Sequence, residues 1–228
     1  LDRGTFLLGE AGGQELPQRA NIPPNIPALS GAPVDLGQFA ATDWLRNHLG
    51  RDLLPVNLNL AAMRKPQRPL NPGYKVSPDG TTLPWSVWEL QKNPERHQEW
   101  IDHVACGLPL LEAIRAKTQE ADNHAYFEVD YQTGHKVKSI GLSDGTFSLL
   151  ALSILPFLDN VPALVAVEEP ENGIHPKAVE VILESLQVLD HSQAWITTHS
   201  PIVVAVTKPE HIICLSMTKG SGVQAVRG

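Results

Sequence analysis

Cysteine is scarce in this sequence of 228 residues. The two cysteines, Cys106 and Cys214, lie far apart along the chain. A pair at this separation provides neither a disulfide framework nor the paired spacing of a zinc site. A reducing compartment is therefore the expected environment, and we predict a cytoplasmic protein whose two cysteines are buried as small apolar residues.

Long apolar runs and an excess of basic residues are also missing. No apolar run approaches the roughly 18 residues that a membrane-spanning helix needs, and no basic segment followed by an apolar one opens the chain as a signal peptide would. The net charge is −7, from 18 Lys and Arg against 25 Asp and Glu. The sequence therefore predicts no membrane contact and no chain-wide nucleic-acid surface, although a local basic patch stays open.

The overall composition is typical of a folded domain. Hydrophobic residues make up 42% of the chain and charged residues 19%, which argues against whole-chain disorder. The chain opens on Leu1 rather than on a methionine, and residues 5–8 read as a strand, so we expect a piece of a longer protein. Residues 11–33 hold five prolines, which predicts a loop.

Hydrophobic periodicity predicts the regular elements of the chain. Helices are predicted over 35–49, 84–92, 94–105, 146–158 and 176–189, and strands over 54–60, 126–131, 164–167, 194–198 and 211–215. In the last part of the chain, short apolar strands alternate with helices. This order predicts an α/β fold with a buried, mostly parallel sheet that is flanked by helices.

Paired carboxylates directly follow one of these strands. Glu168 and Glu169 come after the apolar segment 163–167. Ligands collect outside the carboxyl ends of parallel strands, and two adjacent carboxylates repel each other unless a cation or a proton intervenes. Mg²⁺ that is also bound to phosphate oxygens fits this pattern, and a solvated acidic turn is the alternative.

Two further segments carry polar side chains where elements begin or end. Residues 142–146, Leu-Ser-Asp-Gly-Thr, precede an apolar helix, where free backbone N–H groups suit a phosphate. An ordinary N-cap by Ser143 or Asp144 is the alternative. Residues 197–201, Thr-Thr-His-Ser-Pro, bring His199 to a strand end, where it can donate to a phosphate or position a water. The alternative there is a capping Ser200 beside an uninvolved histidine.

Taken together, these three segments resemble the C-terminal half of an ABC-type ATPase head of the RecF, SMC and OLD kind, and most of all the stand-alone AAA/ABC ATPases of prokaryotes. The matching parts are a signature segment at 142–146, a Walker B strand with its continuation at 164–176, and a switch segment at 197–201. The resemblance implies a P-loop NTPase-like fold that lacks its N-terminal lobe here. It divides the chain into a continuation of that lobe at 1–53, a middle segment with a helical insertion at 54–120, and a C-terminal lobe at 121–228.

The resemblance also implies roles for individual residues. Glu169 would be the general base that orients the attacking water, and His199 would be the switch histidine at the γ-phosphate. Glu168, in place of the usual Asp, would hold Mg²⁺ through water. ATP shared with a second copy would be contacted by Ser143, Asp144, Gly145, Asn172 and His175, of which the last two lie in the segment called the D-loop. The implied cofactors are ATP and Mg²⁺.

One part of the family pattern has no counterpart in the sequence. A Walker A loop, G-x-x-x-x-G-K-[ST], cradles the phosphates in such ATPases, and no Gly-Lys pair occurs here. We expect the loop to lie in a lobe outside this chain. A partner that supplies the loop and a protein that does not hydrolyse ATP are the alternatives.

The resulting prediction is an ATPase head that forms a homodimer around ATP and Mg²⁺ and couples hydrolysis to a conformational change, in DNA repair or anti-phage defence. A catalytically inactive regulatory or scaffolding subunit with the same dimer surface is the alternative. An effector or nuclease subunit and DNA are further candidate partners. The basic residues available for DNA are Arg64, Lys65 and Arg68, for which a solvated loop is the simpler interpretation.

The remaining aromatic and histidine side chains carry no ligand-binding pattern. Core or helix packing is expected of Trp85, Trp88 and Trp100, and surface exposure is expected of His97, His103 and His124.

Overall fold

The computed structural model describes residues 40–71, 73–218 and 222–228, and the chain divides into two compact units, Leu1–Leu53 and Leu54–Gly228. In the first unit the structure describes helix α2 (Ala40–Arg51), which carries the exposed side chains of Trp44, Leu45 and Leu49. The strand predicted at residues 5–8, the loop at 11–33 and the start of the helix predicted at 35–49 lie outside the described residues.

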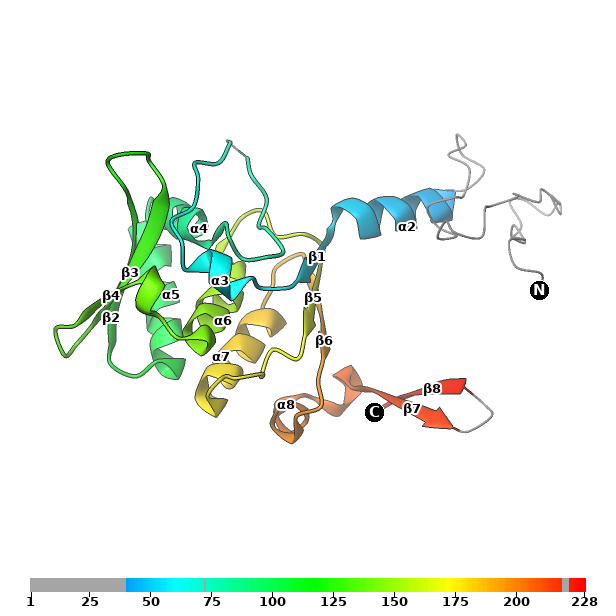
Figure 1. Ribbon diagram of the computed structural model, residues 1–228. Coiled ribbons are helices and arrows are strands. Elements are labelled where there is room, and N and C mark those ends of the chain that lie inside the picture. The colour runs from blue at the N-terminus through cyan, green and yellow to red at the C-terminus, as the bar shows by residue number, and fades with distance from the viewer. Residues whose placement is uncertain (1–39, 72, 219–221) are drawn as a thin grey trace. The chain divides into compact units, whose positions relative to one another are not determined.

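A three-stranded sheet positions the predicted site. Its order is β1 (Leu53–Val56), β5 (Leu164–Glu168) and β6 (Gln193–Thr197), and β5 and β6 run parallel. Helix α7 (Pro176–Gln187) connects the two parallel strands, as a crossover connection between parallel strands requires. The parallel pair with its crossover helix confirms the predicted α/β class (Figure 1).

Helices α5 (Pro94–Gly107), α6 (Asp144–Ser153) and α7 pack against one another beside this sheet. Helices α5 and α7 approach each other closely at Gly107, because a Cβ at this position would lie 2.9 Å from the Cα of Ala178. The helices predicted over 94–105 and 176–189 are confirmed. Helix α6 ends earlier than predicted, and a short 3₁₀ turn (Leu155–Phe157) follows it. Pro156 explains this end, since it lacks the N–H that a continuing helix needs.

A second sheet is antiparallel and consists of β2 (Leu111–Thr118), β3 (Ala125–Tyr131) and β4 (Lys136–Lys138). Strand β3 was predicted, whereas β2 and β4 were not. Helix α4 (Leu83–Leu90), also predicted, packs against β2 and β3. The apolar core is continuous between the two sheets and includes the fully buried side chains of Trp100, Phe127 and Phe147.

The C-terminal strands correct one prediction. The segment predicted at 211–215 as a further strand of the parallel sheet is β7 (Ile213–Thr218), which pairs antiparallel with β8 (Gly222–Arg227) in a separate hairpin. The described side chains of this hairpin are exposed. A second correction concerns 54–60, where the strand ends at Val56 and helix α3 (Leu60–Met63) begins soon after. The other short elements are α8 (Pro201–Val206) and 3₁₀ turns at Ser139–Gly141 and Pro209–His211.

Several single residues differ in exposure from the prediction. Cys106 and Cys214 are exposed rather than buried. The three histidines expected at the surface are half-buried, namely His97, His103 and His124. Among the tryptophans, Trp100 lies in the core and donates its Nε1–H to Ser153 Oγ at 3.1 Å, while Trp85 and Trp88 are half-buried. Within the described residues, no helix combines the length and apolar character that crossing a membrane demands.

Candidate active site

The ends of β5 and β6 bring two of the predicted segments together. In the parallel register Glu168 lies opposite Thr197, and the backbone N–H of Glu169 donates to Thr197 O at 2.9 Å. The acidic segment after β5 and the switch segment after β6 therefore leave the sheet side by side at one edge.

At this edge the side chains of Glu169 and His199 converge. His199 Nε2 lies 3.7 Å from Glu169 Oε1, with 93% of the histidine side chain and 36% of the glutamate side chain exposed. This separation is longer than a hydrogen bond but within ion-pair range, and solvent reaches both partners.

The second oxygen of Glu169 is held by its own loop. Asn172 Nδ2 donates to Glu169 Oε2 at 2.6 Å, which orients the carboxylate and leaves Oε1 on the side of His199. The backbone at Glu169 has φ of 45°, in the left-handed region that a residue with a side chain adopts at a cost of about 1 kcal/mol. The loop thus holds this carboxylate in place despite an unfavourable backbone.

Glu168 ends β5 with an exposed side chain. The donor set around it is small, since the described part of the chain contains no group of three or more His, Cys, Asp or Glu residues that could hold a metal ion. Mg²⁺ characteristically takes one or two protein carboxylates and completes its shell with phosphate oxygens and water. Glu168, exposed at the end of β5, offers one carboxylate of the kind that such a cation takes.

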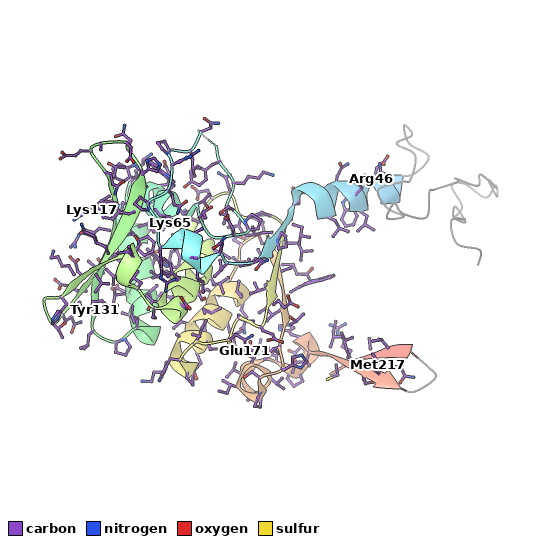
Figure 2. The ribbon with its side chains drawn as sticks, viewed as in Figure 1. Arg46, Lys65, Lys117, Tyr131, Glu171 and Met217 are labelled. Atoms are coloured by element: carbon purple, nitrogen blue, oxygen red, sulfur yellow. The ribbon has the colours of Figure 1, made fainter. Side chains whose placement is uncertain are left out.

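A hydrogen-bonded link that the sequence did not predict ties the two loops together. Thr198 Oγ1 donates to Glu171 Oε1 and accepts the backbone N–H of Ser200 at 2.9 Å. Figure 2 labels Glu171, whose other carboxylate oxygen, Oε2, is buried without a hydrogen-bond partner. This link fixes the backbone on either side of His199. The only sign of it in the sequence is that Thr198 and Glu171 belong to the same two segments as His199 and Glu169.

The signature segment begins helix α6. Ser143 is its N-cap, and Ser143 Oγ accepts the backbone N–H of Thr146 at 3.1 Å, so the capping interpretation of Ser143 is correct as far as local structure goes. Gly145 lies against the D-loop of the same chain, because a side chain there would lie 3.1 Å from Gly173 O. The signature segment and the D-loop are thus in direct contact.

Asp144 has a partner that the sequence did not predict. Arg64 Nη2 donates to Asp144 Oδ1 at 2.6 Å and to Leu142 O at 2.9 Å. The interpretation of Arg64, Lys65 and Arg68 as a solvated loop is therefore wrong for Arg64, because its guanidinium is engaged by the signature segment.

His175 is the other D-loop residue that was predicted to contact ATP. It is exposed and forms the N-cap of α7. Its Nδ1 accepts the backbone N–H of Lys177 at 3.3 Å. The structure therefore brings Glu169, His199 and Asn172 together, whereas Ser143, Asp144 and Gly145 form a second group at the start of α6. Within the described residues no hydrogen bond or ion pair joins the two groups directly.

Among solved structures, the chain is similar to SMC ATPase heads. One comes from work on ATP-driven dimerization and DNA-stimulated activation of SMC ATPases, with 15% identity, a TM-score of 0.46, and coverage of 62% of this chain and 88% of that one. The Smc head of Pyrococcus yayanosii with a coiled coil and joint gives 17% identity and a TM-score of 0.44, with coverage of 60% and 27%. The Pyrococcus furiosus Smc head bound to the C-terminal domain of ScpA gives 14% identity and a TM-score of 0.47, with coverage of 62% and 37%. The chain thus spans well under half of the two Pyrococcus chains.

No protein with a curated description matches the sequence. A protein-family model does match, over residues 31–205, and its description is "AAA domain, putative AbiEii toxin, Type IV TA system". This match covers most of the chain and agrees with the parallel strands and the acidic strand end that the structure places at one edge. The chain belongs to this AAA domain family.

Proposed function

We propose that this chain is part of an ATPase head that binds ATP with Mg²⁺, dimerises around the nucleotide and hydrolyses it. The observation that carries the proposal is the convergence of Glu169 and His199, both open to solvent, at the carboxyl edge of the parallel strands. A general base and a hydrogen-bond donor that are neighbours at one solvent-open edge suit a water and a terminal phosphate that approach them from solvent.

Each residue of the edge has a defined task in this mechanism. Glu169 Oε1 orients the attacking water and accepts its proton, while Asn172 holds the other oxygen. His199 contacts the γ-phosphate, and Glu168 holds Mg²⁺ through water. When bound, the cation neutralises charge on the β- and γ-phosphates, as in other phosphoryl-transfer sites.

The start of α6 serves a nucleotide on the second copy. Ser143 and Gly145 present backbone N–H groups of a helix N-terminus, which favours a phosphate, and residues 172–175 line the same dimer surface. Within the described residues no hydrogen bond or ion pair links Ser143 or Gly145 to Glu169, which agrees with a site that two copies complete together. The Walker A loop that cradles the phosphates comes from outside this chain.

Glu169→Gln in the full-length protein tests the hydrolysis step. We expect ATP turnover to fall about a hundredfold or more, because the amide cannot accept the proton. We also expect ATP to hold the variant as a dimer, measured by light scattering after gel filtration. Glu180→Gln, an exposed change on α7, is the matched control, and unchanged turnover in Glu169→Gln would reject the assignment.

The output of the cycle is the finer part of the proposal. We propose a role in DNA repair or anti-phage defence, with an effector or nuclease as partner, and the toxin–antitoxin system in the family description fits a defence role. The rival candidate is an inactive regulatory subunit with the same dimer surface, and the absence of a Gly-Lys pair from the sequence favours it. A dimer that forms equally well without ATP would select this rival.

A further inference from the structure

The guanidinium of Arg64 connects the end of helix α3 to the signature segment. It donates to Leu60 O at 3.1 Å through Nη1, and through Nη2 to Leu142 O at 2.9 Å and Asp144 Oδ1 at 2.6 Å. Its partners are thus a helix carbonyl on one side and both a carbonyl and a carboxylate of the signature segment on the other.

The same guanidinium is also packed against the core. Its central carbon lies 5.1 Å from the ring centroid of Phe147, which is fully buried and contacts Phe127 of β3 edge to face at 5.7 Å. The Arg64 side chain is 28% exposed. A charge held over a buried ring and by three acceptors has little freedom to move.

We propose that Arg64 is a positioning residue that holds the signature segment in the shape that receives the nucleotide of a second copy. This inference rests on the proposed function. In the proposed mechanism Arg64 contacts no reacting atom, and it acts through its hydrogen bonds with Leu142 and Asp144.

The charge of Asp144 explains why the segment needs this partner. Asp144 is the first residue of α6, beside the backbone N–H groups that are proposed to face a phosphate. Its negative carboxylate stabilises the N-terminus of the helix, but it repels an approaching triphosphate. Pairing with Arg64 offsets the negative charge and turns the carboxylate toward α3.

An arginine suits this task better than a lysine does. The planar guanidinium donates from Nη1 and Nη2 in fixed directions, and here it serves acceptors on two different elements. A lysine keeps the charge but offers a single ammonium group. We therefore expect Arg64→Lys to retain part of the effect and Arg64→Gln to lose it.

Amide hydrogen exchange tests the positioning without any nucleotide. In Arg64→Gln we expect the hydrogen-bonded backbone amides of Leu142, Thr146 and Phe147 to exchange roughly tenfold faster, the change expected when a charge-assisted hydrogen bond is lost. Arg96→Gln is the matched control, because Arg96 also bonds one carboxylate, that of Asp159 at 2.5 Å, and one carbonyl, Pro156 O at 3.3 Å. Unchanged exchange at these three amides would overturn the inference. If Arg64→Gln does not fold, Arg64→Lys and Asp144→Asn give the same comparison.

A second measurement links Arg64 to the dimer. In full-length protein that carries Glu169→Gln, we expect Arg64→Gln to weaken the ATP-bound dimer at least tenfold while ATP binding by a single head stays unchanged. Arg64→Lys should fall between, and Arg96→Gln should have no effect. A trapped dimer that tolerates Arg64→Gln overturns the inference. A failure of Glu169→Gln to trap any dimer counts against the proposed function instead, and the exchange result still decides whether Arg64 holds the segment.

Discussion

Single side chains at the candidate site each hold two neighbours in place. Thr198 bonds both Glu171 and Ser200, and Arg64 bonds both Leu142 and Asp144. Such paired contacts restrict loops that have little regular backbone pairing of their own. The catalytic geometry proposed here therefore depends on residues outside the reacting set.

The sequence led to some of these residues and not to others, for a physical reason. Glu169 and His199 each follow an apolar strand, and strand ends of a parallel sheet meet at one edge, so their proximity was predictable. Arg64 and Asp144 are 80 positions apart. Nothing local in the sequence relates them, since the contact arises from the packing of α3 against α6.

His97 on α5 provides a prediction about pH. Burial lowers its pKa below the ordinary 6.5, and the charge of Arg115 lowers it further, while a hydrogen bond with the backbone of Ile114 opposes the shift. Its Nε2 is buried and has no hydrogen-bond partner. Because the pKa is lower in the folded state, the folded protein binds fewer protons than the unfolded chain at mildly acidic pH. The stability that the neutral imidazole contributes is present above pH 6.5 and is lost as the pH falls through the folded pKa.

Urea unfolding from pH 7.5 to pH 5 measures this effect as a decline in the free energy of unfolding. The decline should be shallower in His97→Gln, which has no charge to gain. His211→Gln, at an exposed position, should retain the wild-type slope. Equal slopes in His97→Gln and the wild type would contradict the role of His97.

At the scale of elements, helices and the parallel strands were easier to predict than strand partners. Helix α7 and strand β5 have clear periodicities and proline or turn boundaries, and the structure confirms both. Strand β2 reads Leu-Glu-Ala-Ile-Arg-Ala-Lys-Thr, which is rich in helix formers, so only its pairing with β3 makes it a strand. The apolar segment of β7 resembles a buried strand, and its pairing with β8 rather than β6 has no local signal.

The contact between α5 and α7 allows a prediction about packing. Gly107→Ala places a methyl group 2.9 Å from the Cα of Ala178, so the helices must separate. We expect a loss of about 1–3 kcal/mol in the free energy of unfolding, as for other overpacked cores. Cys106→Ala, an exposed change on the same helix end, should leave the urea midpoint almost unchanged. A Gly107→Ala variant as stable as the wild type would mean that the helices adjust without cost.

At the scale of the whole molecule, the buried apolar residues of the larger unit join both sheets and the helices between them, and the last of these residues along the chain is Val203. The hairpin β7–β8 contributes no buried side chain among its described residues. The hydrophobic stabilisation of the unit therefore arises before the hairpin begins.

Removal of residues 213–228 tests this division. We expect the shortened chain to unfold in one cooperative transition, with a free energy within about 0.5 kcal/mol of the full chain, as for changes at exposed positions. Circular dichroism during urea unfolding measures both quantities. If the shortened chain instead loses several times that much free energy of unfolding, the hairpin supports the core.

The left-handed backbone of Glu169 has a consequence for the evolution of this family. Glycine or asparagine would relieve the conformational penalty at that position and would make the loop more stable. Selection for folding alone would therefore drive position 169 away from an acid, and lineages that no longer needed turnover should drift toward those two residues. If Glu169 is the general base proposed above, an acid should persist at this position only in heads that hydrolyse ATP.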